Sequence, residues 1–323
     1  MTKIFLHTLI FTLFLSFSLY SGCDFDKIKS KAITGNLDVD VDETVEPLMK
    51  KQKDEFERLN PEAKLFLTTL PTTNCIADLI NGKTKTIVVT RDFTGEEKKI
   101  IADNKLEFKK FEFAIDGIAF IVNPKNPVLR VTSDDLKNIF TGEYKNWTDI
   151  KSQNEEQNSE TKSYFSGSKG NIKLFIQRQN SAVYNFVKDS VMKRMDYSSS
   201  AAVCSTSTQM LQMVRENVNA IGIVNMAWLS EGNQDSLDAT VKALRVSQIT
   251  ATGFQKDFVQ FHQGYLANGN YPYRRYVYLM TGDLGIGLTT GFLNYLLKPD
   301  GQKVVLKNGL VPVSQPVQTI QLN

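Results

Sequence analysis

The feature that most constrains the fold of this chain is the alternation of short apolar runs with segments of helical spacing. The runs at 86–90, 111–122 and 172–176 have the length and apolar composition of buried strands. Helical spacing of apolar residues follows each of them, as in 182–187 with Ala182, Phe186 and Val187. Strands that alternate with helices along a whole chain favour parallel sheets covered by helices. We therefore expect an α/β fold.

The same patterns predict the remaining elements. Further strands are expected in 37–45, where alternating Leu37, Val39 and Val41 precede a turn at 42–44, and at 63–70, 220–229, 243–249 and 273–280. Helices are expected at 47–59, 76–80, 94–104, 133–140, 209–217, 291–297 and 300–308, with a capping box at 94–97 and Gly142 just past the fourth helix. Residues 151–170 are polar and lack periodicity, so we expect a loop there.

The N-terminus has the features of an export signal. Lys3 precedes an almost continuously apolar stretch at 4–19, which is short for a membrane span but suits a signal-peptide core. Small residues then lead to Cys23, with Tyr20 where a lipoprotein signal usually has Leu. We expect a lipoprotein signal peptide at 1–22, a lipid anchor on Cys23 and a tether at 23–35. A plain secretory signal is the alternative.

Charge and residue usage argue against several classes of function. The formal charge of +3 over 323 residues is too balanced to indicate nucleic-acid binding. His262 is the only histidine after the signal, so neither a metal site nor another cofactor is expected. The spacing of Cys75 and Cys204 leaves their pairing open. An enzyme that uses Cys75 or Ser181 as nucleophile remains an alternative, but no motif supplies a base other than His262.

Four loops of similar composition each follow an expected strand and precede an expected helix. They cover residues 43–45, 71–74, 90–92 and 178–181, and each offers a hydroxyl group. Ligands of parallel sheets lie at such strand ends, and free amide groups at a helix start favour an oxyanion. The same residues also serve as ordinary helix caps, so an anion site and plain strand–helix joints both stay open.

Several segments, in order along the chain, match motifs of one known family. Residues 87–97 (IVVTRDFTGEE) contain a Thr-Arg pair before a helix start, and residues 116–124 (DGIAFIVNP) look like a hinge strand. The most specific match is 136–147 (LKNIFTGEYKNW), with shorter matches at 220–223, 271–274 and 301–312. From about residue 37 to 318, the chain thus resembles the lipoprotein form of the phosphate-binding proteins of phosphate ABC transporters.

The resemblance implies the type II periplasmic-binding-protein fold, in which two lobes close on the anion. Each lobe is expected to contain a mixed, mostly parallel sheet flanked by helices. With the first crossing strand near Phe113 and the return near Tyr271, lobe one would comprise residues 36–113 and 271–323, and lobe two residues 114–270.

Position by position, the resemblance implies ten ligand-binding residues. In lobe one these are Thr44, Val45, Thr72, Thr73, Thr90 and Arg91, and in lobe two Arg178, Ser181, Ala182 and Val183. Two positions depart from the family pattern. Val183 replaces a threonine, and Arg178 lies one residue closer to Ser181 than in many members.

Three of these positions have other interpretations. Arg91 can instead pair with Glu96 or Glu97, and the threonines at 72 and 73 can simply cap the next helix. Some members also use a carboxylate to accept the proton of hydrogen phosphate, which disfavours a fully ionised oxyanion. At the aligned place this chain has Thr90, and Asp92 is the candidate substitute.

The implied function is capture of inorganic phosphate in the cell envelope and delivery to the permease subunits of an ABC transporter. The resemblance implies no enzymatic activity, and we expect a lipid-anchored monomer that works outside the cytoplasmic membrane without a nucleic-acid partner. The alternative is a binding protein or sensor for another oxyanion or acidic ligand, without a role in transport.

Overall fold

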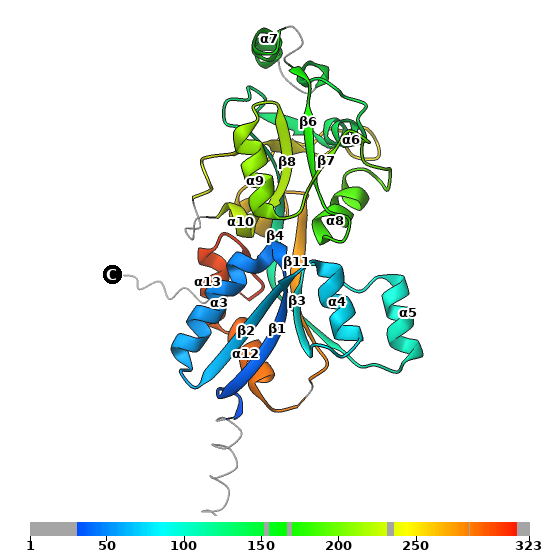
Figure 1. The fold of residues 1–323 in the computed structure, drawn as a ribbon. Helices are drawn as coiled ribbons and strands as arrows, with labels where there is room; N and C mark the ends of the chain where they lie inside the picture. Colours follow the sequence, from blue (N-terminus) through cyan, green and yellow to red (C-terminus); the bar gives the residue numbers. More distant parts are fainter. Residues whose placement is uncertain (1–30, 152–154, 167–169, 231–235, 284, 315–323) are drawn as a thin grey trace, which may run out of the picture.

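One long strand, β4 (Lys109–Val122), runs through both halves of the molecule and joins them (Figure 1). The computed structural model describes residues 31–151, 155–166, 170–230, 236–283 and 285–314. The predicted signal peptide, Cys23 and most of the tether therefore lie outside the described residues. We call the half that contains β1 lobe one and the half that contains β8 lobe two.

Lobe one is built on the strands β2 (Ala63–Leu70), β1 (Gly35–Asp42), β3 (Thr86–Val89), β11 (Arg274–Thr281) and the first part of β4, in that order. The first three strands are parallel, and β11 is antiparallel to both of its neighbours. Around the sheet lie η1 (Glu43–Val45), α3 (Glu46–Leu59), α4 (Thr72–Ile80), α5 (Gly95–Asp103), α12 (Leu288–Leu297) and α13 (Pro299–Lys307), and β12 (Val311–Pro312) pairs with β4.

Lobe two continues the same sheet through the second part of β4, then β8 (Ala220–Asn225), β6 (Lys173–Gln177) and β7 (Ala202–Cys204). Its helices are α6 (Ser133–Thr141), η2 (Trp147–Asp149), α7 (Glu155–Tyr164), α8 (Ala182–Ser190), α9 (Ser207–Glu216), α10 (Met226–Leu229) and α11 (Gln263–Ala267). The short strand β9 (Lys242–Ala243) pairs with β4, while β5 (Arg130–Thr132) and β10 (Arg245–Ser247) form a separate pair.

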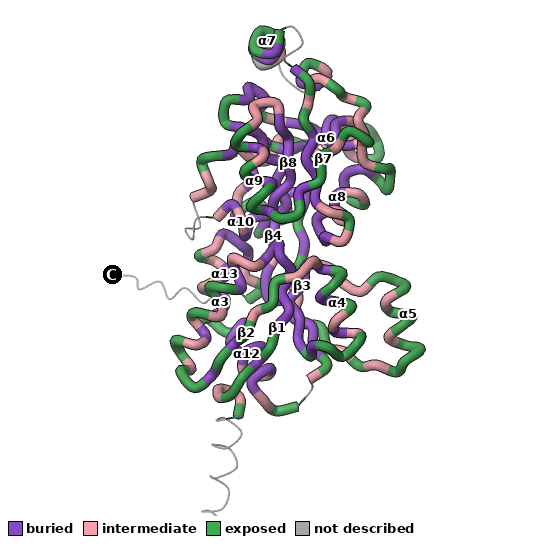
Figure 2. Tube along the Cα trace, in the orientation of Figure 1, coloured by how far each residue is buried: buried purple, intermediate pink, exposed green. Residues whose placement is uncertain are grey.

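The two lobes meet where β4 changes partner. It pairs with β11 as far as Gly117 and with β8 from Ile118 onward. The crossing therefore lies within one continuous strand, which is buried from Phe113 onward except at Ile115 and which Figure 2 shows as a mostly purple column through the middle of the molecule. The division of the chain at residues 113 and 271 stays a prediction.

Three expectations about single elements were wrong. Residues 155–164, expected in a loop, form α7, whose sequence has almost no apolar face and so gives no periodic signal. The run expected as one strand at 220–229 is β8 followed by α10, because a short apolar run does not distinguish strand from helix. The strand expected at 243–249 is divided between β9 and β10, which have different partners.

Candidate anion-binding cleft

A buried carboxylate, Asp42, lies at the centre of a hydrogen-bonded cluster where the two lobes meet, and we call this meeting place the cleft. Asp42 is the last residue of β1 and is 1% exposed. Its Oδ1 accepts a hydrogen bond of 3.0 Å from the backbone N–H of Thr44, and its Oδ2 accepts hydrogen bonds of 2.6 Å from both Thr72 Oγ1 and Thr90 Oγ1. Sheet order explains this meeting, because β1 lies between β2 and β3, so that the turns after all three parallel strands are neighbours.

Lobe two contributes the N-terminus of α8 to the same cleft. The backbone N–H of Ala182 donates to Thr72 Oγ1 at 3.2 Å, while Ser181 Oγ accepts from Val183 N and caps the helix. On the rim, Thr73 donates to the carbonyl of Asn180 through both its backbone N–H, at 3.3 Å, and its hydroxyl, at 3.1 Å. Donors from both lobes thus meet at one place, with the positive end of a helix beside them.

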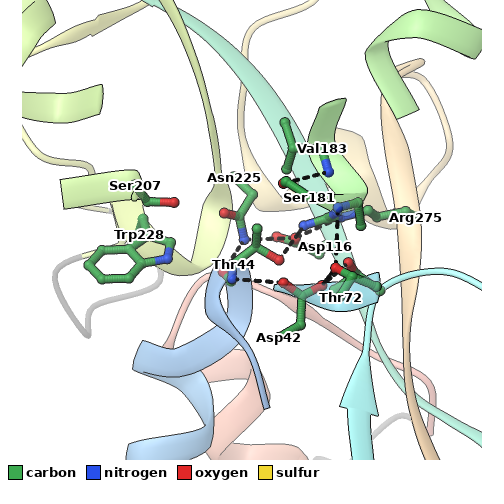
Figure 3. Close-up of polar contacts among 12 residues, drawn as sticks. Asp42, Thr44, Thr72, Asp116, Ser181, Val183, Ser207, Asn225, Trp228 and Arg275 are labelled. Carbon is green, nitrogen blue, oxygen red and sulfur yellow. Dashed lines mark hydrogen bonds and ion pairs between the residues drawn. The ribbon is translucent and has the colours of Figure 1, made fainter. Parts of the chain in front are cut away.

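A second buried group lies next to Asp42, on the crossing strands. Arg275 of β11 donates from Nη2 to Thr44 Oγ1 at 2.9 Å and to Asp116 Oδ2 of β4 at 3.1 Å. Asn225, at the end of β8, donates to both Asp116 Oδ2 and the carbonyl of Thr44. Burial raises the pKa of Asp116, and the Arg275 guanidinium opposes that rise. Figure 3 shows Asp42, Thr44 and Thr72 converging beneath Asp116 and Arg275.

The neighbouring carboxylate, Glu43, joins lobe one to a helix of lobe two. It accepts hydrogen bonds from the backbone N–H of Ser207, at 2.7 Å, and from the Ser207 hydroxyl, so it occupies the N-terminus of α9. Its carbonyl accepts from the indole of Trp228 at 3.0 Å. Burial raises the pKa of Glu43 to about 7, although the Ser207 hydrogen bonds and the nearby positive charge of Arg178 lower it and Asp42 raises it further.

The structure brings most of the ten predicted residues to this cleft. Thr44, Thr72, Thr90 and Ala182 belong directly to the hydrogen-bonded cluster, and Ser181 and Val183 form the helix start beside it. Thr73 lies at the rim, and Val45 is fully buried where η1 meets α3. The role of these residues in binding stays a prediction.

The two predicted arginines lie in different surroundings. Arg91 forms a two-pronged ion pair with Glu97, with both N–O distances at 2.8 Å, which is the alternative partner named for it above. Arg178 is half-buried near Glu43. Asp92, the candidate proton acceptor, accepts instead from Lys98 and Lys110 and is absent from the described contacts of the cluster.

Five residues of the cleft were not predicted: Asp42, Glu43, Asp116, Asn225 and Arg275. A signal for two of them was present in the sequence. Asp116 and Arg275 are lone charges at inward positions of apolar strands, and a charge buried there needs a partner. Which partner it finds depends on strand pairing, and that is not visible in the sequence.

Little in the described residues favours other chemistry. Within the described ranges, no group of three or more His, Cys, Asp and Glu side chains is arranged to hold a metal ion, and none of the helices there is long and apolar enough to cross a bilayer.

Cys75 and Cys204 are both free and buried. Burial raises the pKa of Cys75 and raises that of Cys204 to about 11, which keeps both sulfurs as poorly nucleophilic thiols at neutral pH.

Comparisons with known proteins identify the family of this chain. A family model described as the PBP superfamily domain matches residues 29–300. The phosphate-binding protein PstS of Staphylococcus saprophyticus is 25% identical over 263 residues, covering 81% of this chain and 75% of that protein. The phosphate-binding protein PstS of Bacillus subtilis is 24% identical over 304 residues, covering 94% and 89%.

A solved structure shows the same fold. It is that of a candidate phosphate ABC transporter substrate-binding protein from Clostridium perfringens, with bound phosphate. The alignment has a TM-score of 0.69 and 21% identity, and it covers 87% of this chain and 100% of that one. This likeness confirms the predicted two-lobe α/β fold.

Proposed function

This chain belongs to the PBP superfamily, and from that premise we propose that it binds inorganic phosphate between its lobes and delivers it to the permease of an ABC transporter. The names of its relatives, which are phosphate-binding proteins, support the choice of phosphate. A ligand bound between two lobes couples its capture to closure of the lobes. A permease can recognise the closed form.

The observation that carries this proposal is the meeting of donors from both lobes at one buried point. Thr44 N, Thr72 Oγ1 and Thr90 Oγ1 from lobe one all reach Asp42, and Ala182 N from lobe two reaches Thr72. Amide and hydroxyl donors beside a helix N-terminus suit a tetrahedral oxyanion, whose oxygens each accept several hydrogen bonds.

Asp42 suits the role of proton acceptor that the sequence assigned to Asp92. A carboxylate inside the donor cluster repels a fully ionised oxyanion such as sulfate but accepts a hydrogen bond from the P–OH of hydrogen phosphate. The anion also competes with Asp42 for the hydroxyl donors of Thr72 and Thr90, because each hydroxyl has a single hydrogen.

In this proposal the protein works in the cell envelope as a monomer, held to the membrane by a lipid on Cys23. The signal-peptide pattern of residues 1–22 and the small residues before Cys23 support this placement. Phosphate and the permease subunits are its partners, and binding involves no covalent chemistry.

The test is calorimetric titration of the purified chain, freed of carried-over ligand, with phosphate and separately with sulfate. We expect a one-to-one heat signal with phosphate and a much weaker one with sulfate. Equal affinity for phosphate and sulfate would show that Asp42 does not discriminate between them. An absence of heat with both would overturn the proposed function itself.

A second candidate is a binding protein or sensor for another acidic ligand, without transport. One observation favours it, because three donors of the cluster already bond to Asp42, which makes this cleft less open to a dianion. Growth on limiting phosphate after deletion of the gene distinguishes the two. Unchanged phosphate uptake favours the sensor, whereas impaired uptake favours the transporter subunit.

A further inference from the structure

The register of β11 directs one arginine into the interior. Successive residues alternate, so that Arg274 and Tyr276 are exposed while Arg275 and Val277 are buried. Arg275 pairs directly across the ladder with Asp116 of β4, which is fully buried. A charge pair removed from water this completely is a weak source of stability, so its place beside the donor cluster points to a role in binding.

The hydrogen bonds of Arg275 use only part of its donor capacity. Nε and Nη2 donate to Asp116 Oδ2, and Nη2 also donates to Thr44 Oγ1. Nη1 is buried and has no hydrogen-bond partner within the described part of the chain. A guanidinium nitrogen removed from water without a partner is costly, which points to a partner supplied from outside the chain.

The guanidinium is held rigidly at the edge of the cluster. Asp116 accepts the hydrogen bonds of the guanidinium on one side. Asn225 from lobe two donates to Asp116 Oδ2 at 2.8 Å and to the carbonyl of Thr44 at 2.7 Å, which holds both in place. Thr44 is in turn fixed by Asp42 through its backbone N–H. Figure 3 shows the Arg275 side chain entering from the crossing strand toward this group. Little side-chain entropy is then lost when the arginine binds a ligand.

We propose that Arg275 binds an oxygen of the captured oxyanion through Nη1, and that Asp116 and Asn225 are its positioning residues. This inference rests on the proposed function and specifies which cation of the chain faces the ligand. It also adds one charge-assisted donor beside Asp42, while the charge of Arg275 stays balanced by Asp116.

The two arginines that the sequence predicted for the site are less suited than Arg275 to bind the oxyanion. Arg91 has both terminal nitrogens paired with Glu97. Arg178 is half-buried, and its charge acts on Glu43. Arg275 is 6% exposed and hydrogen-bonds directly to Thr44, a member of the donor cluster.

The first experiment compares two neighbouring substitutions by phosphate titration. Arg275→Lys keeps a positive charge for Asp116 but removes Nη1, and Arg274→Lys changes the exposed arginine that donates to the carbonyl of Leu266. We expect phosphate affinity to fall about 10- to 100-fold in Arg275→Lys, the loss of one charge-assisted hydrogen bond, and to stay within about twofold in Arg274→Lys.

Unfolding of both variants without phosphate separates binding from stability. A purely structural Arg275 would lower the melting temperature and leave the affinity of the folded protein unchanged, and that result would overturn the inference. Equal phosphate affinity in the parent chain and in Arg275→Lys would also overturn the inference, and it would leave the proposed function standing. No binding by the parent chain would overturn both.

A second measurement requires no substitution. In a crystal structure of the parent chain grown with phosphate, we expect a phosphate oxygen within about 3.2 Å of Arg275 Nη1. A water molecule at Nη1, with the phosphate held elsewhere, is the contrary outcome. That result would make Arg275 part of a hydrated hinge and overturn its role as a ligand-binding residue.

Discussion

The ligand preference of this cleft depends on a few side chains whose charge is buried. Asp42 accepts hydrogen bonds from three separate turns, so it organises the cluster and would compete with any anion for the same donors. A carboxylate in this position selects for a ligand that can donate a hydrogen as well as accept several. In the proposed function, the chemistry of this one residue determines which oxyanion is bound.

Substitution of Asp42 tests this selectivity. In Asp42→Asn the side chain loses its charge and one acceptor, so we expect the preference for phosphate over sulfate to fall at least about tenfold. Calorimetric titration with both anions measures the ratio. Asp38→Asn, an exposed position on the same strand, is the matched control and should leave the ratio unchanged. An unaltered ratio in Asp42→Asn would assign selectivity to another group.

Among the elements, α9 has two tasks, because it covers β8 and presents its N-terminus to lobe one. The helix packs closely over the strand at Gly222, where a Cβ would lie 2.6 Å from Met210 Sδ and 2.8 Å from Val214 Cγ2. The same helix begins at Ser207, which binds Glu43. The packing of an element in lobe two therefore sets the position of a contact between the lobes.

We expect Gly222→Ala to push α9 away from β8. The clash should lower the free energy of unfolding by about 1–3 kcal/mol and also weaken phosphate binding, since Ser207 moves with the helix. Denaturant unfolding and titration measure the two effects. Gly95→Ala, at the open start of α5 with nothing within 4 Å, should change neither. A variant that loses stability with normal affinity would show that α9 and the lobe contact are independent.

In the molecule as a whole, three of the described hydrogen bonds between the lobes come from residues at strand ends or at the helix starts that follow them. Asn225 reaches the carbonyl of Thr44, Ala182 reaches Thr72, and Ser207 reaches Glu43. These are polar contacts of modest strength, unlike the continuous apolar core around β4. Hydrogen bonds of this kind can break and form again at small cost. A change of charge among them shifts the equilibrium between open and closed lobes.

Glu43 makes the stability of the folded protein dependent on pH. With the lobes in contact its pKa is about 7, well above the ordinary value of 4.5. Between these two values the native protein holds a proton that the unfolded chain has released, so stability falls as pH rises from 4.5 to 7. The shift corresponds to about 3 kcal/mol, lost progressively over that range.

Glu43→Gln should remove this dependence, because the amide is neutral at every pH. We expect the stability of the variant relative to the parent chain to increase from pH 5 to pH 8, as measured by urea unfolding. Glu46→Gln, which changes a carboxylate paired with Lys50 near the start of α3, should keep the parental slope. Parallel curves for the parent chain and Glu43→Gln would contradict the assigned pKa.

Much of the local structure follows from residues close together in the chain. The capping box at Thr94 and Glu97 and the end of α6 at Gly142 are as predicted, because each depends on hydrogen bonds or sterics within a few residues. The bounds of β2 are also as predicted. The helix α7 was missed for a related reason, since its polar sequence shows no apolar face. The hydroxyl residues of the cleft were predictable through their turns and the family resemblance.

The sequence by itself determined the order of strands and helices, the caps that begin and end them and the turns that carry Thr72, Thr90 and Ser181. Only the tertiary structure decided which charges meet, placing Asp42 among those hydroxyls and Arg275 against Asp116. The physical reason is that caps and periodicity act over a few residues. Partners of a buried charge are set by sheet pairing between segments more than 150 residues apart, as Arg275 and Asp116 are.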